Sequence, residues 1–204
     1  VVMTAPHVGN TGMNDEDPES ERIWVSGYVV RDPSRIVSNW RAQRTLDEDL
    51  QAYGVVGIAG IDTRALTRHL RDAGAMRVGI FSGPAASRPV DELLSEVRSS
   101  PSMVGADLTS DVTTTQAYSV PAIGDAWATV VAVDLGIKSM TPRRLSERGL
   151  NVDVVPSSSS WEDIEARTPD GIFFSNGPGD PATADHAVGL MSKALDAGLP
   201  VFGI

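Results

Sequence analysis

A glycine-rich turn, Asn176-Gly177-Pro178-Gly179-Asp180, directly follows the apolar run at 171–174. Gly177 and Gly179 have no side chains, so their backbone N–H groups can approach a bound ligand closely. Backbone N–H groups that are fixed toward an oxyanion stabilise it by ~3 kcal/mol each. The turn therefore predicts a site at which negative charge develops on oxygen. The alternative is a tight loop in which glycine and proline only satisfy the backbone geometry, because turns favour both residues.

The second part of the chain, residues 127–204, alternates between strand and helix patterns. Its apolar runs predict strands at 129–134, 152–155, 172–174 and 201–204. The β-α-β-α-β-α-β order predicts a doubly wound, mainly parallel sheet, which binds ligands at the carboxyl ends of its strands. The turns after Ser175 and after Ile204 both lie at that end. The run at 201–204 is expected to pair deep in the sheet, beside the strand at 171–176.

The first part, residues 1–118, is expected to form a separate α/β domain, with 119–126 as a linker rich in turn residues. Its apolar runs predict strands at 55–61 and 78–81, and amphipathic spacing predicts a helix around 93–97. Helix caps are expected at Asp62 or Thr63 with a stop at Gly74, at Thr141 with Pro142 and a stop at Gly149, and at Ser159 with Glu162.

Composition excludes several classes of function. The 204 residues carry a net charge of -10, whereas a nucleic-acid surface needs clustered Lys and Arg. No run approaches the ~20 apolar residues of a membrane span. There is no signal-peptide pattern, and a cytoplasmic location is expected. The absence of cysteine excludes disulfides, thiolate metal sites and cysteine catalysis within these residues.

Other polar residues could suggest chemistry, but each has a simpler interpretation. His7 is expected to be a hydrogen-bonded loop histidine, and His69 and His186 to be surface residues. Asp134 is expected to cap the turn that follows its strand. The remaining candidates form two groups. The acidic cluster lacks the pattern of a calcium loop and is expected to be solvated or to contact a basic partner: Asp15, Glu16, Asp17 and Glu19. The arginines are expected to form a solvated helix face: Arg64, Arg68 and Arg71.

The stretch from Gly171 to Pro181, with Val201-Phe202-Gly203-Ile204, resembles the class I glutamine amidotransferases. In that family the Asn-Gly-Pro-Gly-Asp-Pro turn forms one wall of the glutamine pocket. The last strand continues into a cysteine nucleophile, which is expected directly after Ile204. Both ends of the chain read as the interior of strands, so a piece of a longer polypeptide is expected.

Motifs in both parts of the chain resemble the small chain of carbamoyl-phosphate synthetase. They cover nearly the whole sequence: residues 5–12, 14–17, 27–32, 38–41, 60–68, 105–108, 112–114 and 133–138. Those in the first part separate this family from other class I amidotransferases, which share only the glutaminase part.

This resemblance implies a glutaminase that passes ammonia to a large synthetase chain, which makes carbamoyl phosphate for arginine and pyrimidine synthesis using Mg-ATP and bicarbonate. Gly177 and Gly179 match the glutamine-binding glycines of the family, with the Gly177 N–H as an oxyanion donor. No catalytic residue, metal site or cofactor is expected within this chain, which alone is expected to be inactive. The alternative is a non-catalytic module that docks a large partner.

Overall fold

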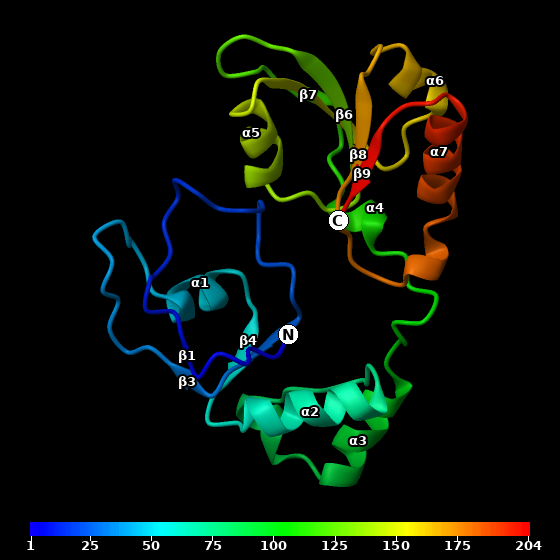
Figure 1. Cartoon of the computed structure of the whole chain (residues 1–204). Coiled ribbons are helices and arrows are strands. Elements are labelled where there is room, and N and C mark those ends of the chain that lie inside the picture. The colour runs from blue at the N-terminus through cyan, green and yellow to red at the C-terminus, as the bar shows by residue number, and fades with distance from the viewer. The chain divides into compact units, whose positions relative to one another are not determined.

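The structure, a computed structural model, describes all residues from 1 to 204 and divides them into two compact units (Figure 1). The first unit is Val1–Pro101 and the second is Ser102–Ile204. The boundary therefore precedes the expected domain end at residue 118. The expected linker at 119–126 is also partly a strand, since β5 (Tyr118–Val120) pairs with β7 (Leu150–Pro156). Its β-branched and aromatic residues suit a strand despite the flanking turn residues.

The second unit is built on one five-stranded sheet, in the order β5-β7-β6-β8-β9. Besides β5 and β7, it contains β6 (Ala128–Asp134), β8 (Gly171–Phe174) and β9 (Val201–Gly203). All neighbouring pairs are parallel except β5 with β7. This confirms the predicted doubly wound α/β fold. β9 lies beside β8 as expected. It is not deep in the sheet, however, because it is the edge strand, and its Phe202 is 66% exposed.

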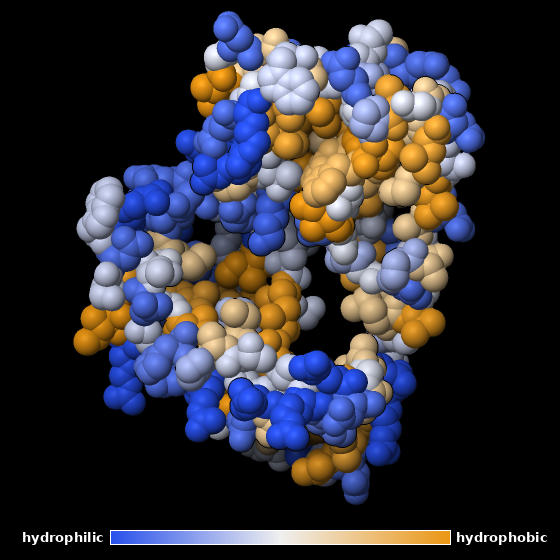
Figure 2. All heavy atoms as spheres, in the orientation of Figure 1, coloured by the Kyte–Doolittle hydropathy of each residue, from blue (hydrophilic) through white to orange (hydrophobic).

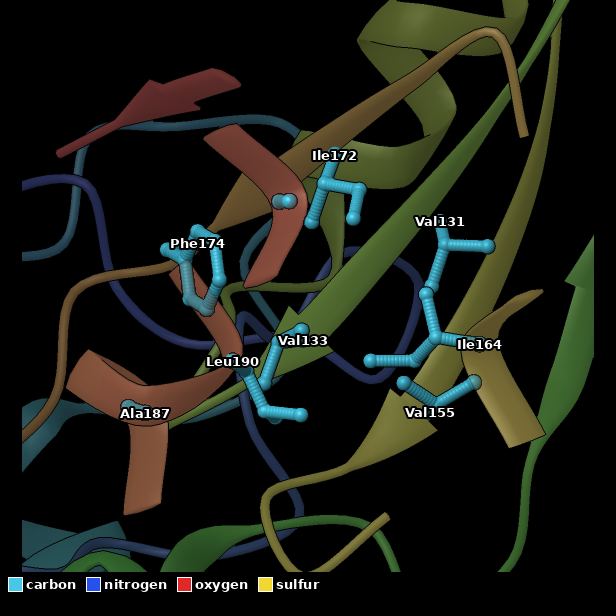
Figure 3. Packing of buried hydrophobic residues seen from close by; sticks show 9 residues of the cluster. Val131, Val133, Val155, Ile164, Ile172, Phe174, Ala187 and Leu190 are labelled. Carbon is cyan, nitrogen blue, oxygen red and sulfur yellow. The ribbon is translucent and has the colours of Figure 1, made fainter. Parts of the chain in front are cut away.

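Helices cover both faces of this sheet. On one face, α6 (Trp161–Glu165) and α7 (Asp185–Asp196) pack against alternate residues of the strands, and Figure 3 shows this cluster. Val131 and Val133 of β6 point into it and are fully buried. Ala132, between them, points to the opposite face, where Leu145 of α5 (Met140–Ser146) packs. Burying each large aliphatic side chain contributes about 1.5–3 kcal/mol.

Two short helical segments complete the second unit at the carboxyl end of the sheet. These are α4 (Thr109–Val112), which precedes the sheet in the chain, and the 3-10 helix η2 (Pro181–Thr183), which leads into α7. In the chain, α4 comes directly after the 105–108 motif and η2 comes directly after the glycine-rich turn. The 105–108 motif and the glycine-rich turn therefore lie at this end of the sheet.

The first unit has less regular structure. Its strands form two parallel pairs, β1 (His7–Val8) with β3 (Asp32–Pro33) and β2 (Gly27–Val29) with β4 (Val56–Ile58). Its helices are α1 (Leu46–Ala52), α2 (Thr63–Ala73), the 3-10 helix η1 (Gly83–Ser87) and α3 (Val90–Ser99). Its buried apolar residues are Val29, Val30 and Leu50.

Several local predictions differ from the structure. Residues 78–81 form no strand, and Val78 is 62% exposed, because no neighbouring strand pairs with them. The strand expected at 55–61 is limited to β4, which pairs on one side only and is not covered on both faces.

The predicted caps were right in part. Asp62 accepts a hydrogen bond from the Ala65 N–H at 3.0 Å and Gly74 ends α2, as predicted. The capping box of α6 lies one residue later than predicted, at Ser160 and Asp163. α5 begins at Met140, so Thr141 and Pro142 are inside its first turn. A pattern of neighbouring polar residues does not fix a helix start to the residue.

No helix has the length and apolar character that crossing a bilayer requires.

Candidate functional site

The glycine-rich turn lies at the carboxyl end of the sheet, as predicted. Ser175, a buried residue that directly follows β8, holds the start of the turn. The Ser175 hydroxyl accepts the Leu135 N–H at 2.9 Å and donates to the Asn176 carbonyl at 2.9 Å. This hydroxyl links the turn after β6 to the start of the glycine-rich turn, and sequence reasoning missed it because a lone serine carries no local signal.

Close packing restricts the position of Gly177 to glycine. Its φ is not positive, so its backbone conformation is open to other residues. A Cβ at this position would, however, stand 2.5 Å from the Leu135 carbonyl oxygen. Gly177 is exposed, and its N–H donates no hydrogen bond to another group of the chain. The exposed position and the lack of an acceptor within the chain leave this N–H available to a ligand.

Gly179 is constrained in two ways. Its φ of 91° is in the region that favours glycine, and a Cβ would stand 2.5 Å from the Ala106 carbonyl oxygen. Its N–H also has no partner within the chain. The structure therefore keeps both glycines as close-packed backbone with unpaired N–H groups, which fits a binding role and a structural role equally.

Asp180 ties the end of the turn to the segment before α4. Its carboxylate accepts the Gly105 N–H at 2.8 Å and the Ala182 N–H at 2.9 Å. Its own N–H donates to the Ala106 carbonyl at 2.9 Å. The bond from Gly105, followed by that from Ala182, lowers the pKa of Asp180, so the side chain accepts as a carboxylate near neutral pH.

Asp134 has the structural role that was predicted. It is 4% exposed, and its carboxylate accepts three backbone N–H groups, from Gly136 at 2.8 Å, Ile137 at 2.7 Å and Thr114 at 2.7 Å. These three bonds hold the turn after β6 and the backbone at Thr114 in place.

A separate cavity of about 310 Å³ opens at the same end of the sheet, beside α7. Its wall combines apolar side chains with five hydroxyl and two ionisable ones: Thr109, Ser110, Ser157, Ser158 and Thr183; Asp107 and His186. The His186 ring lies 2.9 Å from the Ser159 carbonyl oxygen. Neither Gly177 nor Gly179 lines this cavity, so it is distinct from the glycine-rich turn.

Three carboxylates of the acidic cluster in the first unit are paired with arginines of the same unit. Arg44 contacts Asp15 at 2.7 Å, and Arg41 contacts Glu16 at 2.9 Å and Asp17 at 2.8 Å. The hydrogen bond from Arg44 lowers the pKa of Asp15. All of the cluster is exposed, as expected of a solvated loop, and these three carboxylates are in addition paired with arginines at the surface.

The other polar candidates are exposed. His7 lies 3.3 Å from Asp32 across the β1–β3 pair. The three arginines of α2 point to solvent and form no ion pair within the chain: Arg64, Arg68 and Arg71. Figure 2 shows the corresponding hydrophilic surface over α2.

Comparisons with known proteins agree with the geometry. Residues 1–80 match the family described as carbamoyl-phosphate synthase small chain, CPSase domain, and residues 131–204 match glutamine amidotransferase class-I. The chain is 66% identical over 206 residues to the carbamoyl phosphate synthase small chain of Streptomyces coelicolor, covering 100% of this chain and 53% of that protein. It is 55% identical to the corresponding protein of Corynebacterium diphtheriae, covering 100% of this chain and 54% of the relative.

The parallel sheet with its glycine-rich turn, together with the match over 131–204, defines the second unit as a class I glutamine amidotransferase domain. The chain as a whole belongs to the carbamoyl-phosphate synthase small chain family. It spans about half the length of the curated relatives it matches.

Proposed function

We propose that this protein is the glutaminase subunit of a cytoplasmic carbamoyl-phosphate synthase. It would hydrolyse glutamine with water to glutamate and ammonia, and pass the ammonia to a large synthetase chain. The observation that carries the proposal is the turn after β8, where two glycine N–H groups without partners lie within the region that matches the amidotransferase family.

In the proposed reaction, Gly177 and Gly179 bind the substrate glutamine. Attack on the side-chain amide of glutamine places negative charge on its carbonyl oxygen, and the Gly177 N–H donates to that oxygen. This donor is fixed by the packing of Gly177 against Leu135, so it needs no reorganisation as the charge develops.

The nucleophile belongs beside the same turn. β9 pairs with β8 so that Gly203 is opposite Phe174, and the Ile204 N–H donates to the Phe174 carbonyl at 3.2 Å. A cysteine that follows Ile204 would therefore leave the sheet next to residues 175–177. None of the 204 residues is a cysteine, so the proposed nucleophile is outside them.

The proposed synthesis is divided between two chains. The large chain would use Mg-ATP and bicarbonate to make carbamoyl phosphate, the precursor for arginine and pyrimidine synthesis. This chain needs no cofactor in that scheme. Its first unit has no catalytic set and matches the family-specific domain over 1–80, which supports a role in docking the large chain.

The test compares two nitrogen sources. The gene-encoded protein, assembled with the large chain, is expected to support carbamoyl-phosphate synthesis from glutamine and from ammonia, whereas the large chain alone is expected to use only ammonia. Equal use of glutamine with and without this protein would contradict the proposal and favour a docking module without chemistry.

A further inference from the structure

Residues 105–114, here called the clasp, precede β5 in the chain and contact the end of β6, the residue after β7 and the glycine-rich turn that follows β8. In that turn, the Gly105 N–H donates to the Asp180 carboxylate at 2.8 Å and the Ala106 carbonyl accepts the Asp180 N–H at 2.9 Å. These two bonds join the clasp to the residue that ends the glycine-rich turn.

The clasp also holds the ends of β6 and β7. The Thr113 hydroxyl donates to the Asp134 carbonyl at 2.7 Å and accepts the Ser157 N–H at 2.9 Å. The Thr114 N–H donates to the Asp134 carboxylate at 2.7 Å. The clasp is thus anchored to the ends of β6 and β7 at one end and to the glycine-rich turn at the other.

Close packing adds to the hydrogen bonds. At Gly179, a Cβ would stand 2.5 Å from the Ala106 carbonyl oxygen and 3.1 Å from the Leu108 nitrogen, so the turn and the clasp meet backbone to backbone. On the other side of the turn, Gly177 packs against Leu135 in the same way. The turn is therefore held between the clasp and the residues that follow β6.

We propose that Asp180 is a positioning residue, which fixes the N–H groups of Gly177 and Gly179 in their working geometry by tying the glycine-rich turn to the clasp. This inference rests on the proposed glutaminase function. Asp180 does not touch the substrate in this account. It acts through the turn: its carboxylate accepts only the backbone N–H groups of Gly105 and Ala182, and its own N–H donates to the Ala106 carbonyl.

The tether has a direct consequence for catalysis. An oxyanion donor acts only within hydrogen-bonding distance of the developing charge, and a displacement of about 1 Å can cost ~10²-fold in rate. Without the hydrogen bonds of Asp180, the turn that carries the Gly177 N–H is held only by its packing against Leu135. The effect is therefore expected on the rate of glutamine hydrolysis and not on the later steps in the large chain.

The experiment uses the gene-encoded protein assembled with the large chain and compares Asp180→Ala with Asp180→Asn. Asp180→Ala removes both acceptors, whereas the amide oxygen of Asp180→Asn can still accept the Gly105 N–H. The matched control is Asp163→Ala, since Asp163 caps α6 in the same unit through Ser160 and has no bond to the clasp or the turn.

Asp180→Ala is expected to lower the kcat for glutamine hydrolysis by about 10–100-fold, to speed amide hydrogen exchange at Gly105, and to leave ammonia-dependent synthesis unchanged. Asp180→Asn is expected to recover most of the kcat, and Asp163→Ala to keep it at a comparable loss of thermal stability. This pattern separates positioning from a general loss of fold, which the control would share.

Faster exchange at Gly105 with an unchanged kcat would overturn the inference and leave the proposed function intact. An equal loss of kcat in Asp163→Ala would also overturn it, because the effect would then follow stability alone. Failure of the wild-type pair to hydrolyse glutamine at all would overturn the proposed function and the inference with it.

Discussion

The carbonyl oxygen of Leu135 lies where a side chain on Gly177 would begin, 2.5 Å from the position that a Cβ would occupy. Gly177 is thus held by its contact with the turn after β6 and not by a conformation that only glycine reaches. A methyl group there must displace the backbone on one side or the other. The N–H of Gly177 would move with it, so packing and the proposed chemistry are linked at this residue.

The Gly177→Ala variant is expected to lose glutamine-dependent synthesis by ~10²–10³-fold, the usual cost of one oxyanion donor. Ammonia-dependent synthesis is expected to persist, because ammonia bypasses the glutamine site. The control is Gly189→Ala in α7, where a Cβ meets nothing within 4 Å. Loss of both activities in Gly177→Ala would make Gly177 a folding residue, and loss of neither would remove the turn from the glutamine site.

Asp134→Ala is expected to lower the free energy of unfolding by about 3 kcal/mol, because it removes the acceptor of three backbone N–H groups in a buried place and each unsatisfied group costs ~1–3 kcal/mol. The midpoint of urea unfolding measures this change. Asp170→Ala is the control, since Asp170 is exposed and its carboxylate accepts only the Thr129 N–H, at 2.7 Å. A loss no larger than in the control would contradict the structural role of Asp134.

The stability that the ion pairs of the acidic cluster contribute is expected to depend on pH. Arg44 lowers the pKa of Asp15, and hydrogen bonds from Asn14 and then Arg41 lower that of Asp17. Carboxyl groups with a lowered folded-state pKa contribute stability above their unfolded pKa, about 3.9, and lose it as pH falls through the folded value. The pairs are therefore expected to be intact at neutral pH and to weaken only below about pH 4.

The pKa of Asp15 is expected to rise toward its ordinary value in Arg44→Met, as followed by NMR titration of the carboxyl carbon. Arg68→Met on α2 is the control, because Arg68 is exposed and has no ion pair in the chain. An Asp15 titration that is the same in both variants would show that the pair with Arg44 does not persist in solution.

The first unit, Val1–Pro101, is expected to dock the large chain. Deletion of residues 1–101 from the gene-encoded protein is expected to abolish its co-purification with the large chain. Equally tight binding of the remainder would show that the docking surface lies elsewhere.

The sequence predicted the second unit well because its signals are local. The runs that became β6, β7, β8 and β9 are apolar, and turn or cap residues separate them. Features that depend on distant partners were missed. Residues 78–81 are as apolar as a strand but have no neighbour to pair with, and residues 118–120 pair with β7 although turn residues surround them.

The candidate site was predicted only in part, for the same reason. Gly177 and Gly179 were found from their turn and from the family resemblance. The contacts that hold them were not, because Asp180 meets Gly105 and Ser175 meets Leu135 across 75 and 40 residues of chain. Local patterns carry no information on such pairs, although the 105–108 motif was noted as part of the resemblance.

The most direct test of the proposed function follows the nitrogen atom itself. The gene-encoded protein and the large chain are incubated with glutamine labelled with ¹⁵N at the side-chain amide, together with Mg-ATP, bicarbonate and a trace of unlabelled ammonia, and the carbamoyl phosphate is analysed by mass spectrometry. The account predicts that ¹⁵N from glutamine enters carbamoyl phosphate in the wild-type pair and is largely lost in Gly177→Ala. Carbamoyl phosphate that contains only unlabelled nitrogen, formed by a pair that is fully active with ammonia, would contradict it.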